Sequence, residues 1–131
     1  MNKLNILVVD DEEMELEILK NYFEKEGHSV TTAKDGNIAL DEFNKSNYDI
    51  IFLDYNMPGY NGSEVCKIIK KSKPAQKLII LTGNFTDEAY YSSIEDEICP
   101  ECLIYKPIDL EQIKSCMEKV LKGIKIYQTN N

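Results

Sequence analysis

Four short apolar runs, each followed by a polar residue, constrain this fold more than any other feature of the sequence. The runs span residues 6–9, 50–53, 78–81 and 103–105, and they are followed by Asp10 with Asp11, by Asp54, by Thr82 and by Lys106. Short runs rich in β-branched residues and separated by helical patterns are typical of buried strands in a parallel sheet. Ligands of open α/β sheets bind beyond the carboxyl ends of the strands. The sequence therefore predicts one pocket with three carboxylates, a hydroxyl and an ammonium, a set suited to a divalent cation and a phosphoryl group.

Strand and helix patterns alternate five times along the chain. A further strand is expected over residues 29–33, and helices are expected over residues 12–25, 37–44, 64–71, 86–95 and 110–124. Apolar residues recur at helical spacing in these segments, and Gly27 is placed to end the first helix. The alternation predicts an α/β fold, a five-stranded parallel sheet with right-handed crossovers and helices on both faces.

The size and charge of the chain exclude several classes of protein. Its 131 residues are enough for one domain with a buried core and too few for two. With 15 basic and 23 acidic residues the formal net charge is −8, which argues against a nucleic-acid surface. No apolar run approaches the roughly 20 residues of a membrane span, and Asp10 and Asp11 interrupt the one segment that resembles a signal peptide. We therefore expect a cytoplasmic protein that binds neither membranes nor nucleic acids directly.

The cysteines are better explained as core residues than as metal ligands or redox groups. Cys66 and Cys116 lie in apolar helical patterns and are interpreted as core residues. Cys99 and Cys102 form a lone C-x-x-C motif, with no second pair and with His28 as the single histidine of the chain. The sequence gives little support to a metal or redox function for this motif.

The adjacent Asp10 and Asp11 allow two interpretations. Asp10 with Glu13 resembles a variant of the capping box at a helix N-terminus. Two neighbouring carboxylates also repel one another, and a buried pair is tolerated best beside a cation. Mg²⁺, which takes oxygen ligands and keeps several waters, suits such a pair.

The function expected of Asp54, Thr82 and Lys106 depends on whether they share one pocket. Singly, Asp54 could start a turn and Lys106 could be a solvated charge. In one pocket, Asp54 can act as the nucleophile that forms an aspartyl phosphate, with a metal ion between the two anions. Lys106 and Thr82 can then bond to phosphoryl oxygens. The Lys106-Pro107 bond is also a candidate for the cis form.

Taken in this order, Asp10-Asp11, Asp54, Thr82 and Lys106-Pro107 resemble the receiver domain of two-component response regulators. The likeness covers nearly the whole chain, and residues 54–62 are especially similar to those of single-domain chemotaxis receivers. The resemblance implies the flavodoxin-like strand order 2-1-3-4-5. It places the receiver domain at residues 1–125, with a short C-terminal tail or the start of a linker at residues 126–131.

The resemblance also implies a phosphoacceptor and its metal ligands. Asp54 would accept a phosphoryl group from a histidine kinase or a histidine phosphotransfer protein. Asp11 would bind Mg²⁺ directly, and Asp10 would bind it mostly through water. Asp54 and the main-chain carbonyl of Asn56 would supply further ligands.

The remaining polar groups would act on the phosphoryl group itself. Thr82 and Lys106 would hold its oxygens. The side chains of Asn56 and Asn84 would lie near the path of the water that removes it, and would set how long the signal lasts.

Two features depart from the usual receiver pattern. The position three residues before Lys106, where receivers usually carry an aromatic switch residue, holds Leu103. Tyr105 stands next to Lys106 instead, and we expect its side chain on the other face of the sheet. Residues 95–102 are also unusual, because they replace a common Gly-Ala-rich turn and make the stretch before Lys106 slightly long.

These inferences predict a phosphorylation-activated receiver that switches its contacts with partners and is not an enzyme with substrates of its own. The chain would be a stand-alone receiver or the N-terminal part of a longer regulator, so its target is an unknown protein or its own output domain. Three alternatives remain open. They are a phosphorylation-independent docking module on the same fold, an aspartyl-phosphate phosphohydrolase and a flavodoxin-like flavin carrier.

Overall fold

The computed structural model describes residues 3–57, 62–83, 94, 98, 100–123 and 126–127. Strands and helices alternate along the chain, as the sequence predicts. They are β1 (Asn5–Val9), α1 (Glu13–Lys25), β2 (Ser29–Ala33), α2 (Gly36–Lys45), β3 (Ile50–Asp54), α3 (Gly62–Ser72), β4 (Lys77–Thr82), β5 (Cys102–Tyr105), α5 (Leu110–Leu121) and β6 (Ile126–Tyr127). The helix expected over residues 86–95 falls almost wholly outside the described residues.

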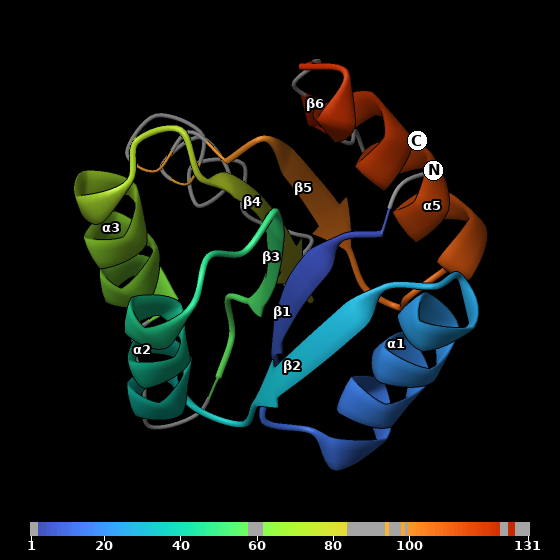
Figure 1. Ribbon diagram of the computed structural model, residues 1–131, viewed down its shortest axis with the longest axis horizontal. Helices are drawn as coiled ribbons and strands as arrows, with labels where there is room; N and C mark the ends of the chain where they lie inside the picture. Colours follow the sequence, from blue (N-terminus) through green and yellow to red (C-terminus); the bar gives the residue numbers. More distant parts are fainter. Residues whose placement is uncertain are drawn as a thin grey trace.

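All neighbouring strands run parallel, in the order β2-β1-β3-β4-β5-β6 (Figure 1). The predicted order 2-1-3-4-5 is therefore confirmed. The structure adds β6, whose two residues pair with Cys102 and Leu103 at the edge of the sheet. The parallel register brings the ends of β1, β3, β4 and β5 to the same edge, which is where Asp54 and Thr82 lie.

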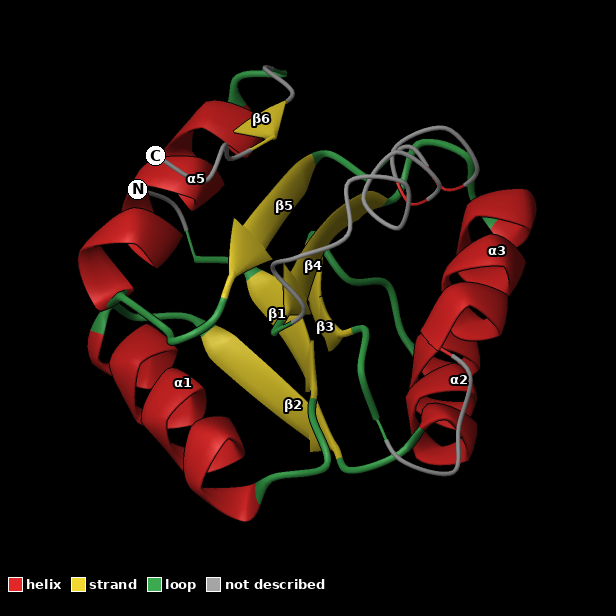
Figure 2. Cartoon of the chain, turned by 180° about the vertical axis from the view of Figure 1, so that it is seen from behind, coloured by secondary structure: helices red, strands yellow, loops and turns green. Residues whose placement is uncertain are grey.

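The sheet is buried on both faces, because α1 and α5 cover one face while α2 and α3 cover the other (Figure 1 and, from behind, Figure 2). Consecutive strand residues therefore alternate between two clusters of apolar side chains. Leu7, Ile51 and Ile80 belong to what we name the α2/α3 cluster, and Val8 and Phe52 belong to the α1/α5 cluster. Each fully buried side chain of this kind contributes roughly 1.5–3 kcal/mol to folding. Two-sided burial explains why the strands are continuous apolar runs and not alternating ones.

Local signals fix the ends of most helices within one or two residues of expectation. Gly27 follows α1 with a φ of 95°, as a residue that ends a helix would. Asp35 caps α2 by accepting a hydrogen bond from the Ile38 backbone N–H at 2.9 Å. Helix α5 ends at Leu121, three residues before the predicted end, and Gly123 follows it with a φ of 83°. Because a left-handed residue cannot continue a helix, the apolar pattern beyond it does not extend α5.

A partly buried ion pair connects α3 to the beginnings of β4 and β5. The Lys70 ammonium lies 2.7 Å from the Glu101 carboxylate and donates to the Gln76 backbone carbonyl at 2.8 Å. Glu101 in turn accepts the Leu78 backbone N–H at 2.8 Å. This contact ties the end of the sheet opposite Asp54 to α3 and gives Glu101, in the unusual segment 95–102, a structural role.

The cysteines within the described residues are packing residues. Cys66 and Cys116 are buried in the core, as predicted. Cys102 is buried in β5, close to the thiol of Cys116. Cys99 lies outside the described residues. Among the helices that the structure describes, none combines the length and the apolar character needed to cross a bilayer.

The His28 imidazole provides a test of the packing between β2 and the start of β1. His28 is buried, and its Nδ1 accepts the Leu4 backbone N–H at 3.1 Å. Burial lowers the pKa of His28 below its ordinary 6.5, so the unfolded chain takes up a proton first as the pH falls. As the pH falls from about 7 to about 5, the free energy of unfolding of wild type should therefore decrease relative to that of His28→Asn.

The measurement is urea unfolding of both proteins across this range. Asn keeps an acceptor near the position of Nδ1 but does not titrate, and every carboxylate titrates equally in both proteins. A difference that stays constant with pH would contradict the assignment of a buried, neutral His28.

Gly62 at the start of α3 provides a second test. A Cβ at this position would lie 2.5 Å from the backbone oxygen of Tyr55, in the segment that follows Asp54. Because the obstacle is backbone, Gly62→Ala should destabilise the fold by about 1–3 kcal/mol. Gly83→Ala is the matched control, since its Cβ would have no neighbour within 4 Å. Equal unfolding midpoints for the two variants in urea would refute this close approach.

Candidate phosphoacceptor site

The predicted site residues come from the carboxyl ends of neighbouring strands. Asp10 follows β1, Asp54 ends β3 and Thr82 ends β4, and each of the three is buried. Lys106 follows β5, where its backbone N–H bonds to the Thr82 carbonyl at 2.8 Å. The Lys106-Pro107 bond is cis, as anticipated.

The Lys106 ammonium joins carboxylates that come from three parts of the chain. Its Nζ lies 3.2 Å from Oδ2 of Asp10, 3.3 Å from Oδ2 of Asp54 and 2.5 Å from Oε2 of Glu15. Asp10 has no exposed surface, and Asp54 is 3% exposed. The structure thus brings together side chains separated by up to 96 positions in the sequence.

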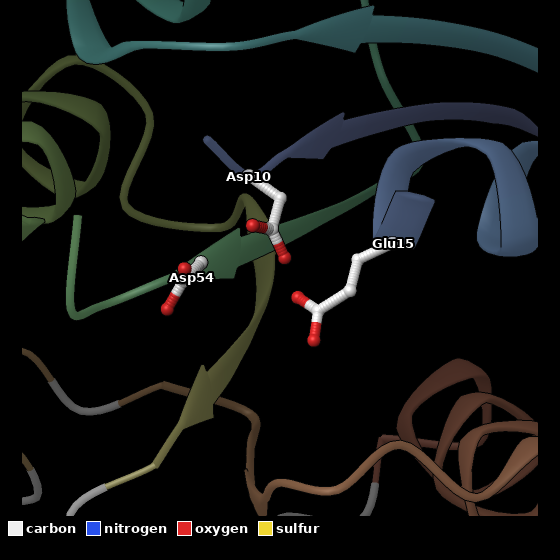
Figure 3. A group of neighbouring side chains, drawn as sticks. All are labelled: Asp10, Glu15 and Asp54. Atoms are coloured by element: carbon white, nitrogen blue, oxygen red, sulfur yellow. The ribbon is translucent and has the colours of Figure 1, made fainter. Parts of the chain in front are cut away.

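Glu15 was not anticipated as a member of the site. It lies in the first turn of α1 and projects towards Asp10 and Asp54 (Figure 3). Oxygen atoms of these three carboxyl groups lie within 4.8 Å of one another. A signal for it exists in the sequence, because Glu15 precedes the buried Leu19 by four residues and so shares its helix face.

Backbone hydrogen bonds orient the two buried aspartates. Oδ1 of Asp10 accepts the Glu12 N–H at 3.0 Å, and Oδ1 of Asp54 accepts the Asn56 N–H at 3.0 Å. The interpretation of Asp10 as a capping residue is wrong, because Glu12 occupies the N-cap position of α1 and makes no side-chain cap bond. Asp10 instead turns its second oxygen to Lys106.

Asn56 contributes its side chain to the site. Its Oδ1 accepts the Thr82 hydroxyl at 2.7 Å and the Gly83 backbone N–H at 3.1 Å. The segment after β3 is thereby tied to the end of β4. The sequence singled out the Asn56 carbonyl as a ligand and its side chain as a neighbour of water, but gave no sign of this contact.

Two other predicted residues are placed differently. Asp11 is exposed and is not part of the close group formed by Asp10, Glu15 and Asp54. Its charge nevertheless raises the pKa of Asp54. Asn84 lies outside the described residues.

Leu103, at the position where receivers usually carry an aromatic residue, is a core residue. Leu103 has no exposed surface and belongs to the α2/α3 cluster. Tyr105 packs against this same cluster, so it lies on the face of Leu103. Residues two apart in a strand point the same way, which agrees with Leu103 and Tyr105 sharing this face. The expectation that Tyr105 lies on the face opposite to the adjacent Lys106 stays a prediction.

The site gathers three carboxyl groups around a single ammonium, so negative charge exceeds positive charge among these groups. Burial raises the pKa of Asp10 to about 8, with the neighbouring Glu15 carboxyl and the Asp54 charge adding to the effect. Burial also raises the pKa of Asp54, against the opposing Asn56 N–H and Lys106 ammonium. Burial alone would lower the pKa of Lys106, but the carboxylates of Glu15, Asp54 and Asp10 raise it above its ordinary value. Lys106 is therefore a permanent cation among acids that lack enough positive charge.

The chain belongs to the response regulator receiver domain family, whose model matches residues 6–118. With its parallel sheet and acidic strand ends, it is a receiver domain of the two-component response regulators. Membership of this class is consistent with a phosphoacceptor role for the site.

Three relatives illustrate the likeness. The chain is 32% identical over 126 residues to the transcriptional regulatory protein PhoP of Bacillus subtilis, covering 96% of this chain and 51% of that protein. It is 42% identical over 82 residues to ResD of the same organism, covering 63% of this chain and 34% of ResD. The crystal structure of the response regulator TrrA from Thermotoga maritima, in complex with Mg²⁺-BeF, has 35% identity and a TM-score of 0.77. That match covers 91% of this chain and 99% of TrrA. The chain thus spans about half or less of the length of these two Bacillus regulators.

Replacing Asp10 by Asn should weaken the pH dependence of stability in metal-free buffer. The pKa of Asp10 rises on folding from 3.8 to about 8, so folding takes up a proton between these values. The stability contributed by the protonated carboxyl is fully present below the lower value and is lost as the pH rises through the upper one. The free energy of unfolding of wild type, measured in urea with EDTA, should fall between about pH 6.5 and about pH 8.5, and that of Asp10→Asn should fall less.

The exposed Asp41 supplies the control, since Asp41→Asn should follow wild type. Above its ordinary pKa of 6.5, His28 is neutral in both states and does not contribute. Equal slopes for wild type and Asp10→Asn would show that Asp10 is ionised in the folded protein.

Proposed function

We propose that this receiver is phosphorylated on Asp54, by a histidine kinase or a histidine phosphotransfer protein, and that phosphorylation switches its contacts with partners. The observation that carries the proposal is the Lys106 ammonium, held between the buried carboxylates of Asp10 and Asp54 at the ends of different strands. A buried nucleophile beside a fixed cation is what phosphoryl transfer to a carboxylate requires.

The reaction needs little from the protein beyond position and charge. An oxygen of Asp54 attacks phosphorus, and a new P–O bond forms. The bond from phosphorus to the leaving imidazole nitrogen, or to the acetate oxygen of acetyl phosphate, breaks with its electron pair on the leaving group. Hydrolysis reverses the modification, because a water oxygen attacks phosphorus and restores the carboxylate.

The donor set of the site fits Mg²⁺. Carboxylate oxygens gathered within 4.8 Å, in a site whose burial raises the pKa of two aspartates, favour an ion with oxygen ligands. We assign Asp10, Asp11, Asp54 and the main-chain carbonyl of Asn56 as the residues that would hold it. A bound Mg²⁺ would supply charge neutralisation between Asp54 and the incoming phosphoryl oxygens. The TrrA complex with Mg²⁺-BeF supports this assignment.

Thr82 and Lys106 are assigned to the phosphoryl oxygens. Lys106 supplies a point charge, and Thr82 supplies a hydroxyl at the end of the adjacent strand. The Thr82 hydroxyl donates to Asn56 in this structure, so it would exchange that acceptor for a phosphoryl oxygen. Phosphorylation would therefore pull on the segment after β3 and on the end of β4 together.

The domain assignment follows the sequence analysis. We assign residues 1–125 to the receiver domain and residues 126–131 to a short C-terminal tail or the start of a linker, whose first two residues add β6 to the sheet. Its partners are the phosphodonor protein and either a separate target or an output domain. The protein catalyses its own phosphoryl transfer and dephosphorylation and acts on no other substrate. We propose a cytoplasmic location and no direct contact with nucleic acid or membranes.

Incubation with acetyl phosphate and Mg²⁺ tests the proposal. Wild type should gain the mass of one phosphoryl group in intact mass spectrometry, and hydroxylamine should remove it because an acyl phosphate is the product. Asp54→Asn should gain nothing, since an amide is not a nucleophile at neutral pH. Asp41→Asn, which removes an exposed carboxylate from α2, should behave as wild type.

The alternatives predict different results. A docking module or a flavin carrier would show no gain in mass with either protein. A phosphohydrolase would release phosphate steadily from added phosphate esters. Modification that persists in Asp54→Asn would assign the phosphoacceptor to another residue.

A further inference from the structure

Glu15 makes the shortest of the contacts that surround the Lys106 ammonium. Its Oε2 lies 2.5 Å from Nζ, against 3.2 Å for Asp10 and 3.3 Å for Asp54. Glu15 comes from α1, whereas Asp10 follows β1 and Asp54 ends β3 (Figure 3). Glu15 is therefore the nearest described partner of the residue assigned to the phosphoryl group.

The ammonium already interacts with three carboxylates, because it donates hydrogen bonds to Asp10 and Glu15 and forms an ion pair with Asp54. A lysine carries three N–H groups, and three carboxylates of the described residues lie within ion-pair distance of Lys106. A phosphoryl oxygen on Asp54 would therefore compete with Asp10 and Glu15 for the Lys106 ammonium.

Burial decides which carboxylate is released. The side chain of Asp10 is fully buried and that of Asp54 is 4% exposed, but that of Glu15 is 21% exposed. Asp54 is also the modified residue itself, and Asp10 is fixed by the Glu12 N–H. Glu15 has a longer side chain at the rim of the site and can rotate into water. Its release therefore leaves the least buried, unpaired charge.

We propose that Glu15 is a positioning residue that holds Lys106 in the resting protein and competes with the phosphoryl group for it. This inference rests on the proposed phosphorylation of Asp54. Glu15 lowers the occupancy of the phosphorylated state in two ways, by withholding the ammonium and by adding a negative charge that repels the anionic donor. It thereby sets how much phosphodonor is needed to switch the protein.

Glu15→Gln and Glu15→Met test the proposal, with Glu17→Gln as the matched control. Glu17 is exposed on the same helix, so its substitution removes an equal charge without touching Lys106. Phosphoryl occupancy is measured by intact mass against acetyl phosphate concentration at saturating Mg²⁺. The half-saturating concentration should fall roughly twofold to fivefold in Glu15→Gln relative to Glu17→Gln, the range expected for one partly exposed ion pair. It should fall at least as far in Glu15→Met, which lacks an acceptor for the ammonium.

A second readout reports on Lys106 without phosphorylation. The side-chain ammonium resonance of Lys106 in the metal-free protein, assigned by its loss in Lys106→Met, should shift in Glu15→Gln and stay in place in Glu17→Gln. In the Lys106→Met background, the difference between adding Glu15→Gln and adding Glu17→Gln should be smaller than in wild type, because only the repulsion of the donor by Glu15 remains.

The remaining outcomes are decisive. If wild type takes up no phosphoryl group, the proposed function fails. If wild type is phosphorylated but Glu15→Gln and Glu17→Gln have equal half-saturation, the competition by Glu15 is refuted. If Glu15→Gln binds Mg²⁺ much more weakly than Glu17→Gln and is phosphorylated less, Glu15 is a metal ligand and the proposal is overturned.

Discussion

The ammonium of Lys106 balances carboxylates that would otherwise repel one another at the edge of a buried sheet. Asp10 and Asp54 end neighbouring strands whose faces are both covered by helices, so water cannot solvate their charges. Burial raises the pKa of both acids, and one lysine cannot neutralise them together with Glu15. This surplus of negative charge would favour the binding of the proposed cation and, through it, of a phosphoryl group.

The apolar strands of the sheet allow this concentration of charge at their carboxyl ends. Period-two alternation along β1, β3, β4 and β5 fills an apolar cluster on each face of the sheet. After Asn5 at the start of β1 and Lys77 at the start of β4, these strands contribute no charged side chain until they end. Burial of the apolar core stabilises the fold and so offsets the cost of placing buried acids at the edge of the sheet. At the opposite end of the sheet, Lys70 and Glu101 form a matched pair with backbone partners.

In the resting protein, the groups suited to a phosphoryl oxygen already have protein partners. The Thr82 hydroxyl donates to Asn56, and the Lys106 ammonium contacts Glu15 as well as the two aspartates. Phosphorylation would therefore act as an exchange of partners, because each new bond to phosphate replaces an existing one. Such an exchange moves the segment after β3 and the first turn of α1, two parts of the surface that a partner protein can read. With Leu103 packed in the core, this coupling does not depend on an aromatic residue at that position.

The sequence by itself determined the strands, their order through a family resemblance, the helix faces and the identity of the strand-end residues. These features are local, because an apolar run, a turn residue such as Gly27 or a polar residue after a strand can be recognised without its neighbours in space. Only the tertiary structure decided that Glu15 reaches Lys106, that Asn56 holds Thr82, that Asp11 is exposed and that Ile126 and Tyr127 pair with β5. These contacts depend on how a helix or loop lies against the sheet. Shifts of a few ångströms decide them, and no periodicity along the chain encodes distances between side chains of different elements.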